Sequence, residues 1–210
     1  IASRYEFMKD SEKFIIEDIV NKLELKSSDR FIDVGCGAGN LTIKLSSFVS
    51  EVNCVDHPNC LKLLSERQSK ARDFKMIPGN FLDIELHEKF DKVLCYSVIH
   101  YLQDYEEIWN FIEKFLAILK PGGIVLIGDI PNISKKNRFM NTEFGKKKND
   151  EYQNLLKKEP KNNKNKIIPD NDCVVIDDLM IINILKNIRD LRFNAYIVDQ
   201  PKNLSLAYTR

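Results

Sequence analysis

The chain has 210 residues, of which 43% are hydrophobic and 30% are charged, and its formal net charge is +1. This size and apolar content suffice for one sizeable core. The balanced charge excludes the strongly basic composition of many nucleic-acid-binding chains and the acidic excess of disordered ones. No apolar run approaches membrane-spanning length. No signal peptide is visible, although the sequence begins at Ile1 rather than at Met, and we expect a cytoplasmic protein without a membrane anchor.

The cysteines do not have the spacing of a metal site. Their number is odd and no two form a C-x-x-C pair; they are Cys36, Cys54, Cys60, Cys95 and Cys173. Since the chain also has only three histidines, we expect no structural zinc site and no other metal centre. Most of these cysteines lie in or beside apolar runs, which is typical of small buried side chains in a reducing compartment.

Helical and strand patterns alternate from residue 11 to residue 130. Apolar residues at near-helical spacing predict helices over residues 11–23, 38–49, 59–71 and 104–119. Short apolar runs predict strands over residues 31–34, 51–56, 74–80, 90–100 and 124–130. The alternation predicts a parallel sheet covered on both faces, with ligands bound at the carboxyl ends of its strands.

The pattern breaks after Ile130. Residues 132–173 contain ten lysines, one arginine and six acidic residues, so this stretch carries a net charge of +5. Its polar composition is typical of a mobile, solvated insertion, and a lid or substrate-recognition segment is the functional alternative. Beyond it, a helix is predicted over residues 176–188, and two strands over residues 193–200 and 204–210. The short turn between these strands can join only antiparallel neighbours, so we expect a mixed sheet with a terminal hairpin.

The stretch RFIDVGCGAGNLT, residues 30–42, runs from a strand into three alternating glycines, Gly35, Gly37 and Gly39. Glycines allow a sharp turn and let a ligand come close to the backbone. The spacing G-x-G-x-G is one residue shorter than the dinucleotide pattern G-x-G-x-x-G, and the G-K-[ST] of a nucleoside-triphosphate loop is absent. Asp33, two residues before the first glycine, would repel a pyrophosphate and suits a ligand with a positively charged amine.

Polar residues also follow the next two strands. Asp56 ends the second strand, where an acid can bind both hydroxyls of a ribose. The turn at residues 79–83, Gly-Asn-Phe-Leu-Asp, follows the third strand and could bracket an adenine. These positions indicate a ligand with an amine, a ribose and an adenine but no phosphate.

At these residues the sequence resembles the class I S-adenosylmethionine-dependent methyltransferases, in their small-molecule-type branch. The resemblance rests on DVGCGAGN, Asp56, GNF, FDKVLCYSVIHYL and LKPGG, which occur in the family's order and spacing over roughly residues 30–130. It implies a Rossmann-like, doubly wound α/β fold whose mixed sheet has seven strands in the order 3-2-1-4-5-7-6, the last antiparallel. We expect a single domain over residues 1–210, with an N-terminal helical segment at 1–26 and a lid-like insertion at 132–173.

The resemblance implies S-adenosyl-L-methionine as the cofactor and S-adenosyl-L-homocysteine as its product. The residues implied to bind it are Asp33, Gly35, Cys36, Gly37, Asp56, His57, Asn80, Phe81 and Ser97. Asp33 would bind the methionyl amine, Asp56 the ribose hydroxyls, and Asn80 with Phe81 the adenine. The family usually has an acid where Asn80 stands; an amide oxygen can still accept from the adenine amino group, and Asp83 is an alternative partner. Structural alternatives stay open: Asp56 as a helix N-cap, His57 as a structural residue, Asn80 as a turn residue and Phe81 as part of the core.

Two residues are candidate bases for an acceptor that must lose a proton. They are His100, at the predicted end of strand four, and Asp129, at the end of strand five. For His100 the alternative is a structural role at the strand end.

The acceptor is expected to be a small molecule. No N-P-P-Y-like motif follows strand four, and no appended nucleic-acid-binding domain is visible. The basic insertion predicts an anionic acceptor, such as a nucleotide-linked sugar or an organic acid, methylated on oxygen or nitrogen. An RNA or protein methyltransferase and a non-catalytic cofactor binder are the alternatives, whereas the glycine spacing disfavours a nicotinamide enzyme.

Overall fold

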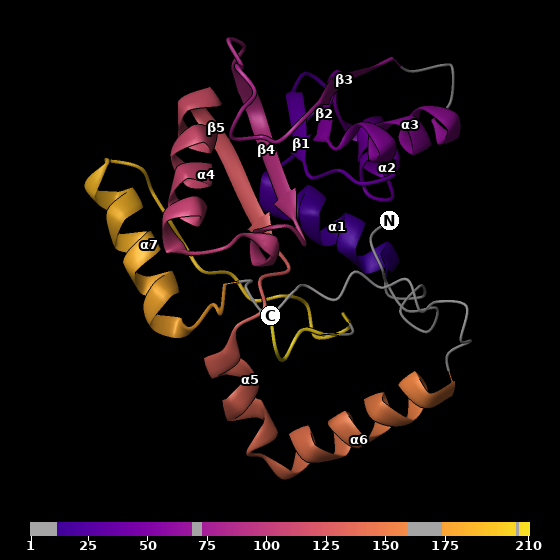
Figure 1. The fold of residues 1–210 in the computed structure, drawn as a ribbon, viewed down its shortest axis with the longest axis vertical. Coiled ribbons are helices and arrows are strands. Elements are labelled where there is room, and N and C mark those ends of the chain that lie inside the picture. The colour runs from indigo at the N-terminus through magenta and orange to yellow at the C-terminus, as the bar shows by residue number, and fades with distance from the viewer. Residues whose placement is uncertain (1–11, 69–72, 159–173, 205) are drawn as a thin grey trace.

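The computed structural model describes residues 12–68, 73–158, 174–204 and 206–210, whose path is shown in Figure 1. The strands are β1 (Arg30–Val34), β2 (Glu51–Asp56), β3 (Phe74–Pro78), β4 (Phe90–Tyr96) and β5 (Leu119–Gly128). The α-helices are α1 (Glu12–Leu23), α2 (Thr42–Leu45), α3 (Pro58–Arg67), α4 (Tyr105–Ile118), α5 (Ile133–Met140), α6 (Glu143–Lys158) and α7 (Asp178–Asp190). The 3₁₀ helices η2 (Ser46–Phe48) and η3 (Ile99–Tyr101) follow α2 and β4. The predicted helical segment before residue 12, and Cys173, lie outside the described residues.

The described strands form one parallel sheet in the order β3-β2-β1-β4-β5. The central strand β1 pairs with β2 and β4, so that Asp33 lies opposite Cys54 and Leu94. Since all five strands run in the same direction, their carboxyl ends meet along one side of the sheet, here called the carboxyl edge (Figure 1). The prediction of a Rossmann-like α/β fold with a parallel sheet is confirmed.

Helices cover both faces of the sheet and bury a core on each. On one face, α1, α2 and α3 contribute the fully buried side chains of Ile19, Leu45 and Leu64. On the other face, α4 and α7 pack over the sheet, with Ile108 and Phe115 of α4 fully buried. This two-sided burial explains why apolar residues follow one another in β4, as Val93, Leu94 and Cys95, rather than alternate with polar ones.

The predicted C-terminal hairpin is wrong for the described residues. Residues 193–200 have no regular secondary structure, and none of the described residues of 204–210 lies in a strand. The described sheet therefore has five parallel strands rather than seven with an antiparallel last strand. Tyr196, Ile197 and Val198 are 74%, 64% and 60% exposed. The apolar residues that suggested a strand are thus not packed against a sheet face, and strand propensity depends on such packing.

Two other elements are shorter than predicted. The helix expected over residues 38–49 is reduced to α2 and η2, because the hydroxyls of Ser46 and Ser47 donate back to the carbonyls of Ile43 and Lys44 at 2.8 and 3.0 Å. The strand expected to end at residue 100 ends at Tyr96. The next residue has a φ of +60°, which a strand cannot continue through.

The predicted insertion is helical over much of its described length. The side chain of Asn132 caps α5 by accepting from the Lys135 amide at 2.8 Å. Along α6, Lys146 pairs with Glu143 and Lys148 with Glu151, each three residues apart. The composition suggested a loop because apolar residues are few, but lysine, glutamate, glutamine and leucine are good helix formers. Figure 1 shows α5 and α6 beyond the carboxyl edge. None of the described helices is both long and apolar enough to cross a bilayer.

Candidate active site

The loop after β1 turns sharply at glycines with left-handed backbones. Gly35 has a φ of +79° and Gly37 a φ of +58°. A Cβ at Gly35 would lie 2.3 Å from Val98 Cγ2, so the loop passes closer to the chain after β4 than a side chain would allow. A Cβ at Gly37 would meet no atom within 4 Å, so Gly37 borders open space. Because α2 has only four residues, the loop's own backbone, rather than a helix dipole, is what this site offers a ligand.

Asp56 holds the glycine loop at the end of β2. Its Oδ2 accepts from the Gly37 amide at 2.7 Å, and its Oδ1 accepts from the His57 amide at 2.6 Å. Asp56 is partly exposed, so its fixed carboxylate remains reachable by a ligand. His57 is the N-cap of α3, where its Nδ1 accepts from the Asn59 amide at 3.2 Å. The side chain of His57 therefore has the structural role of a helix cap, and Asp56 does not.

Asp33 lies beneath the glycine loop rather than at its surface. The residue is 3% exposed, and its Oδ2 accepts a hydrogen bond from the Thr42 hydroxyl at 2.6 Å. Burial raises the pKa of the Asp33 carboxyl from 3.8 to about 7; the hydrogen bond from Thr42 opposes this rise and the charge of Asp56 adds to it. A cation bound nearby would favour the ionised form.

Cys36 is a buried part of the loop. Its Sγ donates to the Gly37 carbonyl at 3.6 Å. A hydrogen bond with Cys54 and burial raise the pKa of the Cys36 thiol far above its usual value, so the thiol stays protonated. The expected burial of Cys36, Cys54 and Cys95 is confirmed. Among the described residues, no three histidine, cysteine or acidic side chains are placed to hold a metal ion.

In the turn after β3, the side chains of Asn80 and Phe81 contact the protein itself. Asn80 Oδ1 accepts from the Leu82 amide at 3.2 Å, which is the bond of a local turn. The ring of Phe81 is 3% exposed and lies 5.2 Å from the ring of Phe111 and 5.0 Å from that of Phe115, between ring centroids. The side chain of Phe81 therefore belongs to the core, which is the structural alternative that the sequence left open for it.

Two basic side chains that the sequence did not single out hold the loops of the site. Lys114 on α4 donates from Nζ to the main-chain carbonyls of Phe81, Leu82 and Ile84. Arg67 at the end of α3 donates from Nη1 to the carbonyl of Ala38 at 2.6 Å and to the side chain of Asn40 at 2.7 Å. Each partner is about 30 residues away in sequence, and no local pattern marks such contacts.

Ser97 and Asp129 meet at the ends of β4 and β5. The Ser97 hydroxyl donates to Asp129 Oδ2, and the Ser97 amide donates to the Gly128 carbonyl at 3.0 Å. On the other side of the carboxylate, Arg210 Nε lies 3.3 Å from Asp129 Oδ1. The predicted base Asp129 is thus already engaged by a hydroxyl and by a guanidinium.

His100 lies in η3, close to the Asp129–Arg210 pair. Its ring centroid is 4.3 Å from that of Tyr101, and its buried Nδ1 has no hydrogen-bond partner in the described chain. Burial lowers the pKa of His100; the charge of Arg210 lowers it further, and that of Asp129 opposes the change. The lowered pKa favours the neutral form of His100, and its buried Nδ1 is left without a hydrogen-bond partner among the described residues.

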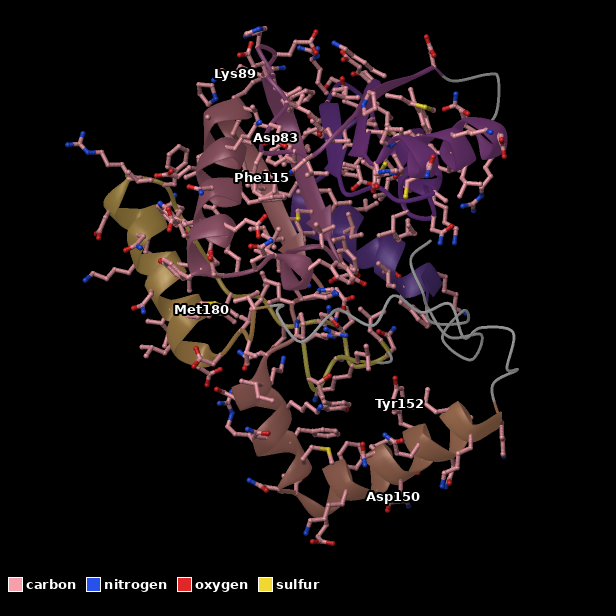
Figure 2. The ribbon with its side chains drawn as sticks, viewed as in Figure 1. Asp83, Lys89, Phe115, Asp150, Tyr152 and Met180 are labelled. Carbon is pink, nitrogen blue, oxygen red and sulfur yellow. The ribbon has the colours of Figure 1, made fainter. Side chains whose placement is uncertain are left out.

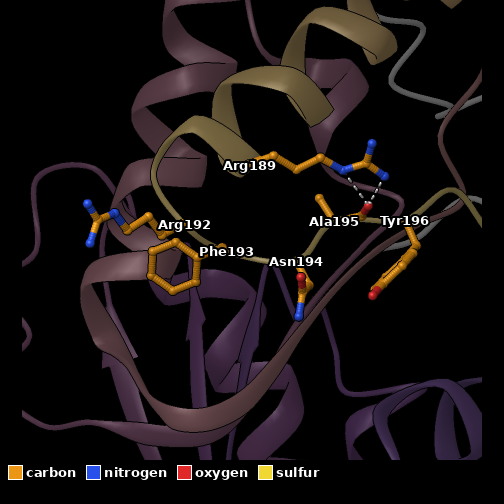
Figure 3. A pocket seen from close by; sticks show the side chains of 6 residues that line it. All are labelled: Arg189, Arg192, Phe193, Asn194, Ala195 and Tyr196. Carbon is orange, nitrogen blue, oxygen red and sulfur yellow. Dashed lines mark hydrogen bonds between the residues drawn. The ribbon is translucent and has the colours of Figure 1, made fainter.

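A pocket at the end of α7 contains none of the predicted site residues. It is lined by Arg189, Arg192, Phe193, Asn194, Ala195 and Tyr196 (Figure 3). The guanidinium of Arg189 is committed to the Ala195 carbonyl through two hydrogen bonds, from Nε at 3.1 Å and from Nη2 at 2.5 Å. Since none of its lining side chains is a carboxylate, histidine or thiol, we place the candidate site at the carboxyl edge.

Solved structures share the fold. The N-methyltransferase NodS from Bradyrhizobium japonicum WM9 aligns with a TM-score of 0.55 and 19% identity, over 71% of this chain and 82% of that one. An S-adenosylmethionine-dependent methyltransferase from Clostridium acetobutylicum ATCC 824 aligns with a TM-score of 0.51 and 24% identity, over 64% and 53% of the two chains. At these identities the likeness is one of fold.

Curated proteins match in sequence. A ubiquinone biosynthesis O-methyltransferase of Rhodopseudomonas palustris (strain BisB18) is 29% identical over 131 residues, 60% of this chain and 50% of that protein. An uncharacterized methyltransferase of Bacillus thuringiensis (strain Al Hakam) is 28% identical over 115 residues, 55% of this chain and 51% of that protein. The chain spans about half the length of the curated relatives it matches. A family model described as a methyltransferase domain matches residues 25–160. This match covers well over half of the chain, which therefore belongs to the methyltransferase domain family.

Proposed function

We propose that this chain binds S-adenosylmethionine at the carboxyl edge and methylates a small, anionic acceptor on oxygen or nitrogen. One observation carries the proposal: Asp56 is fixed by the Gly37 amide at 2.7 Å, beside open space at Gly37. A fixed carboxylate accepts hydrogen bonds from ribose hydroxyls and repels phosphates, so this site suits a nucleoside without phosphate. The names of structures with this fold agree, since one of them is a DhpI-SAM-HEP complex with a TM-score of 0.54.

The residues present fit this cofactor in most respects. The bare backbone at Gly37 leaves room for the sugar and the methionine portion, and Asp56 is placed for the ribose hydroxyls. Asp33 acts from below the loop, where its buried carboxyl would ionise in response to the methionyl ammonium. Phe81 cannot contribute its ring, so any adenine contact from this turn comes from its main chain or from the side chains of Asn80 and Asp83.

Alignment is the main contribution of the protein to this reaction. The cofactor, when bound, supplies a methyl group activated by a sulfonium. The acceptor oxygen or nitrogen forms a bond to the methyl carbon as the carbon–sulfur bond breaks, and the acceptor gives up a proton. Holding two reactants in line can supply roughly 7–11 kcal/mol of the barrier reduction. Ser97 and Val98, which touch Asp129 and the glycine loop respectively, are placed to set this alignment.

His100 is the better supported of the two candidate bases. Its lowered pKa favours the neutral form, and its Nδ1 is without a hydrogen-bond partner in the described chain. Asp129 is held by Ser97 and Arg210, and we assign it to electrostatic stabilisation of the protonated base. A base is needed only for an acceptor that loses its proton before or during transfer.

Helices α5 and α6 are proposed to be a lid over the acceptor. They begin directly after the carboxyl end of β5 and carry eight basic and three acidic residues over 133–158, a net charge of +5. In Figure 2, Tyr152 lies on the side of α6 turned toward the rest of the molecule, and Asp150 on the opposite side. A basic lid over a cleft favours anionic acceptors by raising their local concentration.

A labelled-methyl transfer assay against fractionated small metabolites of the source cell tests the activity. We expect transfer to an anionic fraction, with release of S-adenosylhomocysteine. Transfer to no fraction, together with tight NAD binding and none of S-adenosylmethionine, would end the proposal. Transfer to RNA, with binding that falls steeply as salt rises, would instead favour the RNA methyltransferase alternative, for which the exposed lysines of α6 are the support.

A further inference from the structure

Arg210 is brought to the carboxyl edge by contacts of its own segment with α5. The Asn132 amide donates to the Thr209 carbonyl at 3.1 Å, and Lys135 Nζ donates to the Arg210 carbonyl at 2.7 Å. The ring of Tyr208 stacks on Phe139 with centroids 5.0 Å apart and planes 9° apart. The main chain on which the guanidinium is carried is therefore fixed, and the side chain does not have to be ordered afresh to bind a ligand.

The guanidinium of Arg210 lies among the candidate catalytic residues. Its Nε pairs with Asp129 at 3.3 Å, with 20% of the arginine side chain and 17% of the aspartate side chain exposed. Its positive charge influences both His100 and Tyr152. Within the described chain its Nη1 and Nη2 have no protein partner, so that two donor groups of the planar fork remain for a ligand.

We propose that Arg210 binds the anionic group of the methyl acceptor, and that Asp129 occupies the place of that anion when no acceptor is bound. This inference rests on the proposed function and names the residue that recognises the acceptor. The recognised chemistry is an oxyanion, a carboxylate or a phosphate, which a guanidinium binds with two parallel hydrogen bonds. An acceptor bound in this way would have its other end near Ser97 and His100, which follow the carboxyl end of β4.

In the ligand-free state, the carboxylate of Asp129 neutralises the positive charge of the Arg210 guanidinium. A buried or half-buried guanidinium without a counter-charge is costly, and the carboxylate of Asp129 supplies one. An incoming oxyanion competes with that carboxylate for the same arginine and is repelled by it. Removing the charge of Asp129 should therefore strengthen the binding of a foreign anion, whereas removing that of Arg210 should weaken it at least tenfold. A purely structural ion pair would predict no gain from either change.

The test is an NMR titration of the full chain labelled with ¹⁵N on arginine, using inorganic phosphate and acetate as separate probes. The Nε–H signal that is missing in Arg210→Gln identifies Arg210. We expect this signal to shift on addition of phosphate, acetate or both. In Arg210→Gln, where binding is measured from other signals that shift, the dissociation constant should be at least tenfold higher. We expect Asp129→Asn to bind the same probe at least threefold tighter. Arg192→Gln removes an exposed arginine outside the site and should leave the titration unchanged.

The outcomes separate the inference from the proposed function. The inference would be overturned if Arg210→Gln bound both probes as tightly as the unmodified chain does, or if the unmodified chain bound neither probe. Weaker binding of the probe by Asp129→Asn would also overturn it. The probe that binds in an Arg210-dependent way decides between phosphate and carboxylate. S-adenosylhomocysteine is titrated into the same samples: failure of the unmodified chain to bind it would contradict the proposed function even where Arg210 binds the anion.

Discussion

The hydroxyl of Ser97 and the carboxylate of Asp129 are hydrogen-bonded although 32 residues separate them. Both residues have left-handed backbones, with φ of +60° and +58°. A non-glycine residue in this region costs on the order of 1–3 kcal/mol, and such residues cluster at functional sites. Two neighbouring strands thus end in strained residues that contact each other, which indicates that the pair is kept for its side chains.

Replacing Ser97 with glycine should lower the rate of methyl transfer without lowering the stability of the fold. Glycine adopts a positive φ freely, so Ser97→Gly should unfold at an equal or higher temperature than the unmodified chain while methyl transfer falls at least tenfold. Ser97→Ala keeps the strain and loses the hydrogen bond, and it should be the less stable variant by about 1 kcal/mol. Thermal unfolding and the labelled-methyl assay measure the two effects. A Ser97→Gly variant with full activity would show that the hydroxyl has no part in the reaction.

Removal of the Asp56 carboxylate should weaken cofactor binding. Asp56→Ala leaves the ribose hydroxyls without an acceptor and frees the Gly37 amide, so S-adenosylhomocysteine should bind more weakly by about 1–3 kcal/mol. Isothermal titration calorimetry measures this difference. Glu66→Gln removes one exposed charge from the neighbouring α3 and serves as the control. Equal losses in both variants would mean that net charge, rather than the position of Asp56, sets the affinity.

Asp33 should make stability fall as pH rises from about 4 to about 7. Its pKa is raised from 3.8 to about 7 in the folded chain, so in this window the folded state holds a proton that the unfolded state has lost. Folding therefore takes up a proton, which becomes less favourable as the pH rises. Asp33→Asn cannot ionise and should gain stability over the unmodified chain across this window, by at most about 4 kcal/mol, with no further change above pH 7. Urea unfolding between pH 4 and 8 measures this difference.

The same group should couple cofactor binding to proton release. A methionyl ammonium near Asp33 favours its ionised form, so S-adenosylhomocysteine should bind more tightly as pH rises toward 7. Calorimetry at pH 6 in buffers of different ionisation enthalpy should then show release of up to one proton, and Asp33→Asn should abolish it. Proton release that is unchanged in Asp33→Asn would place the ammonium away from Asp33.

The parallel sheet and the glycine loop could be predicted because their signals are local. Strand and helix periods alternate through residue 130, and the glycines at 35 and 37 take the positive φ that their spacing suggested. The hairpin over 193–210 was wrong because Tyr196 and its neighbours have strand propensity but no sheet to pack on. Phe81 lies in the expected turn and its ring belongs to the core, an alternative that the sequence left open, because α4 places Phe111 and Phe115 beside it.

The contacts of Lys114 and Arg210 could not be read from the sequence. Both act on residues far away along the chain, and lysine or arginine on a helix or tail is ordinarily a solvated side chain. Only the packing of α4 beside the turn after β3 brings the Lys114 ammonium to three carbonyls, and only the contacts with α5 bring Arg210 to Asp129.

Lys114 should therefore support both folding and cofactor binding. Lys114→Met keeps most of the unbranched side chain and leaves the carbonyls of Phe81, Leu82 and Ile84 without their shared donor. Because hydrogen bonds from a charged group contribute about 1.5–3 kcal/mol, we expect a loss of unfolding free energy of that order and weaker binding of S-adenosylhomocysteine. The exposed Lys62→Met on α3 is the matched control. A stable Lys114→Met variant with full cofactor affinity would show that the turn holds its shape alone.

The basic helices α5 and α6, which we propose to be a lid, should attract anionic acceptors. The ion pairs of the described residues indicate which lysines can test this without breaking a contact of the fold. Lys135 pairs with Asp199 and Arg138 with Asp178, so reversing their charges would also break contacts of the fold. Lys136 and Lys147 are exposed and form no ion pair with the described residues. The double variant Lys136→Glu, Lys147→Glu changes the lid charge by four units and should lower kcat/KM for the acceptor found in the labelled-methyl assay.

The dependence of kcat/KM on salt shows whether this double variant loses long-range attraction of the acceptor or has a structural defect. A long-range charge effect is screened as ionic strength rises, with a Debye length of about 10 Å at 0.1 M and about 3 Å at 1 M. The deficit in kcat/KM should therefore be largest at low salt and should nearly vanish at high salt, while the affinity for S-adenosylhomocysteine stays unchanged. The variant Lys136→Gln, Lys147→Gln should show about half of the effect. A deficit that persists at high salt, or no deficit at low salt, would mean that these lysines do not guide the acceptor.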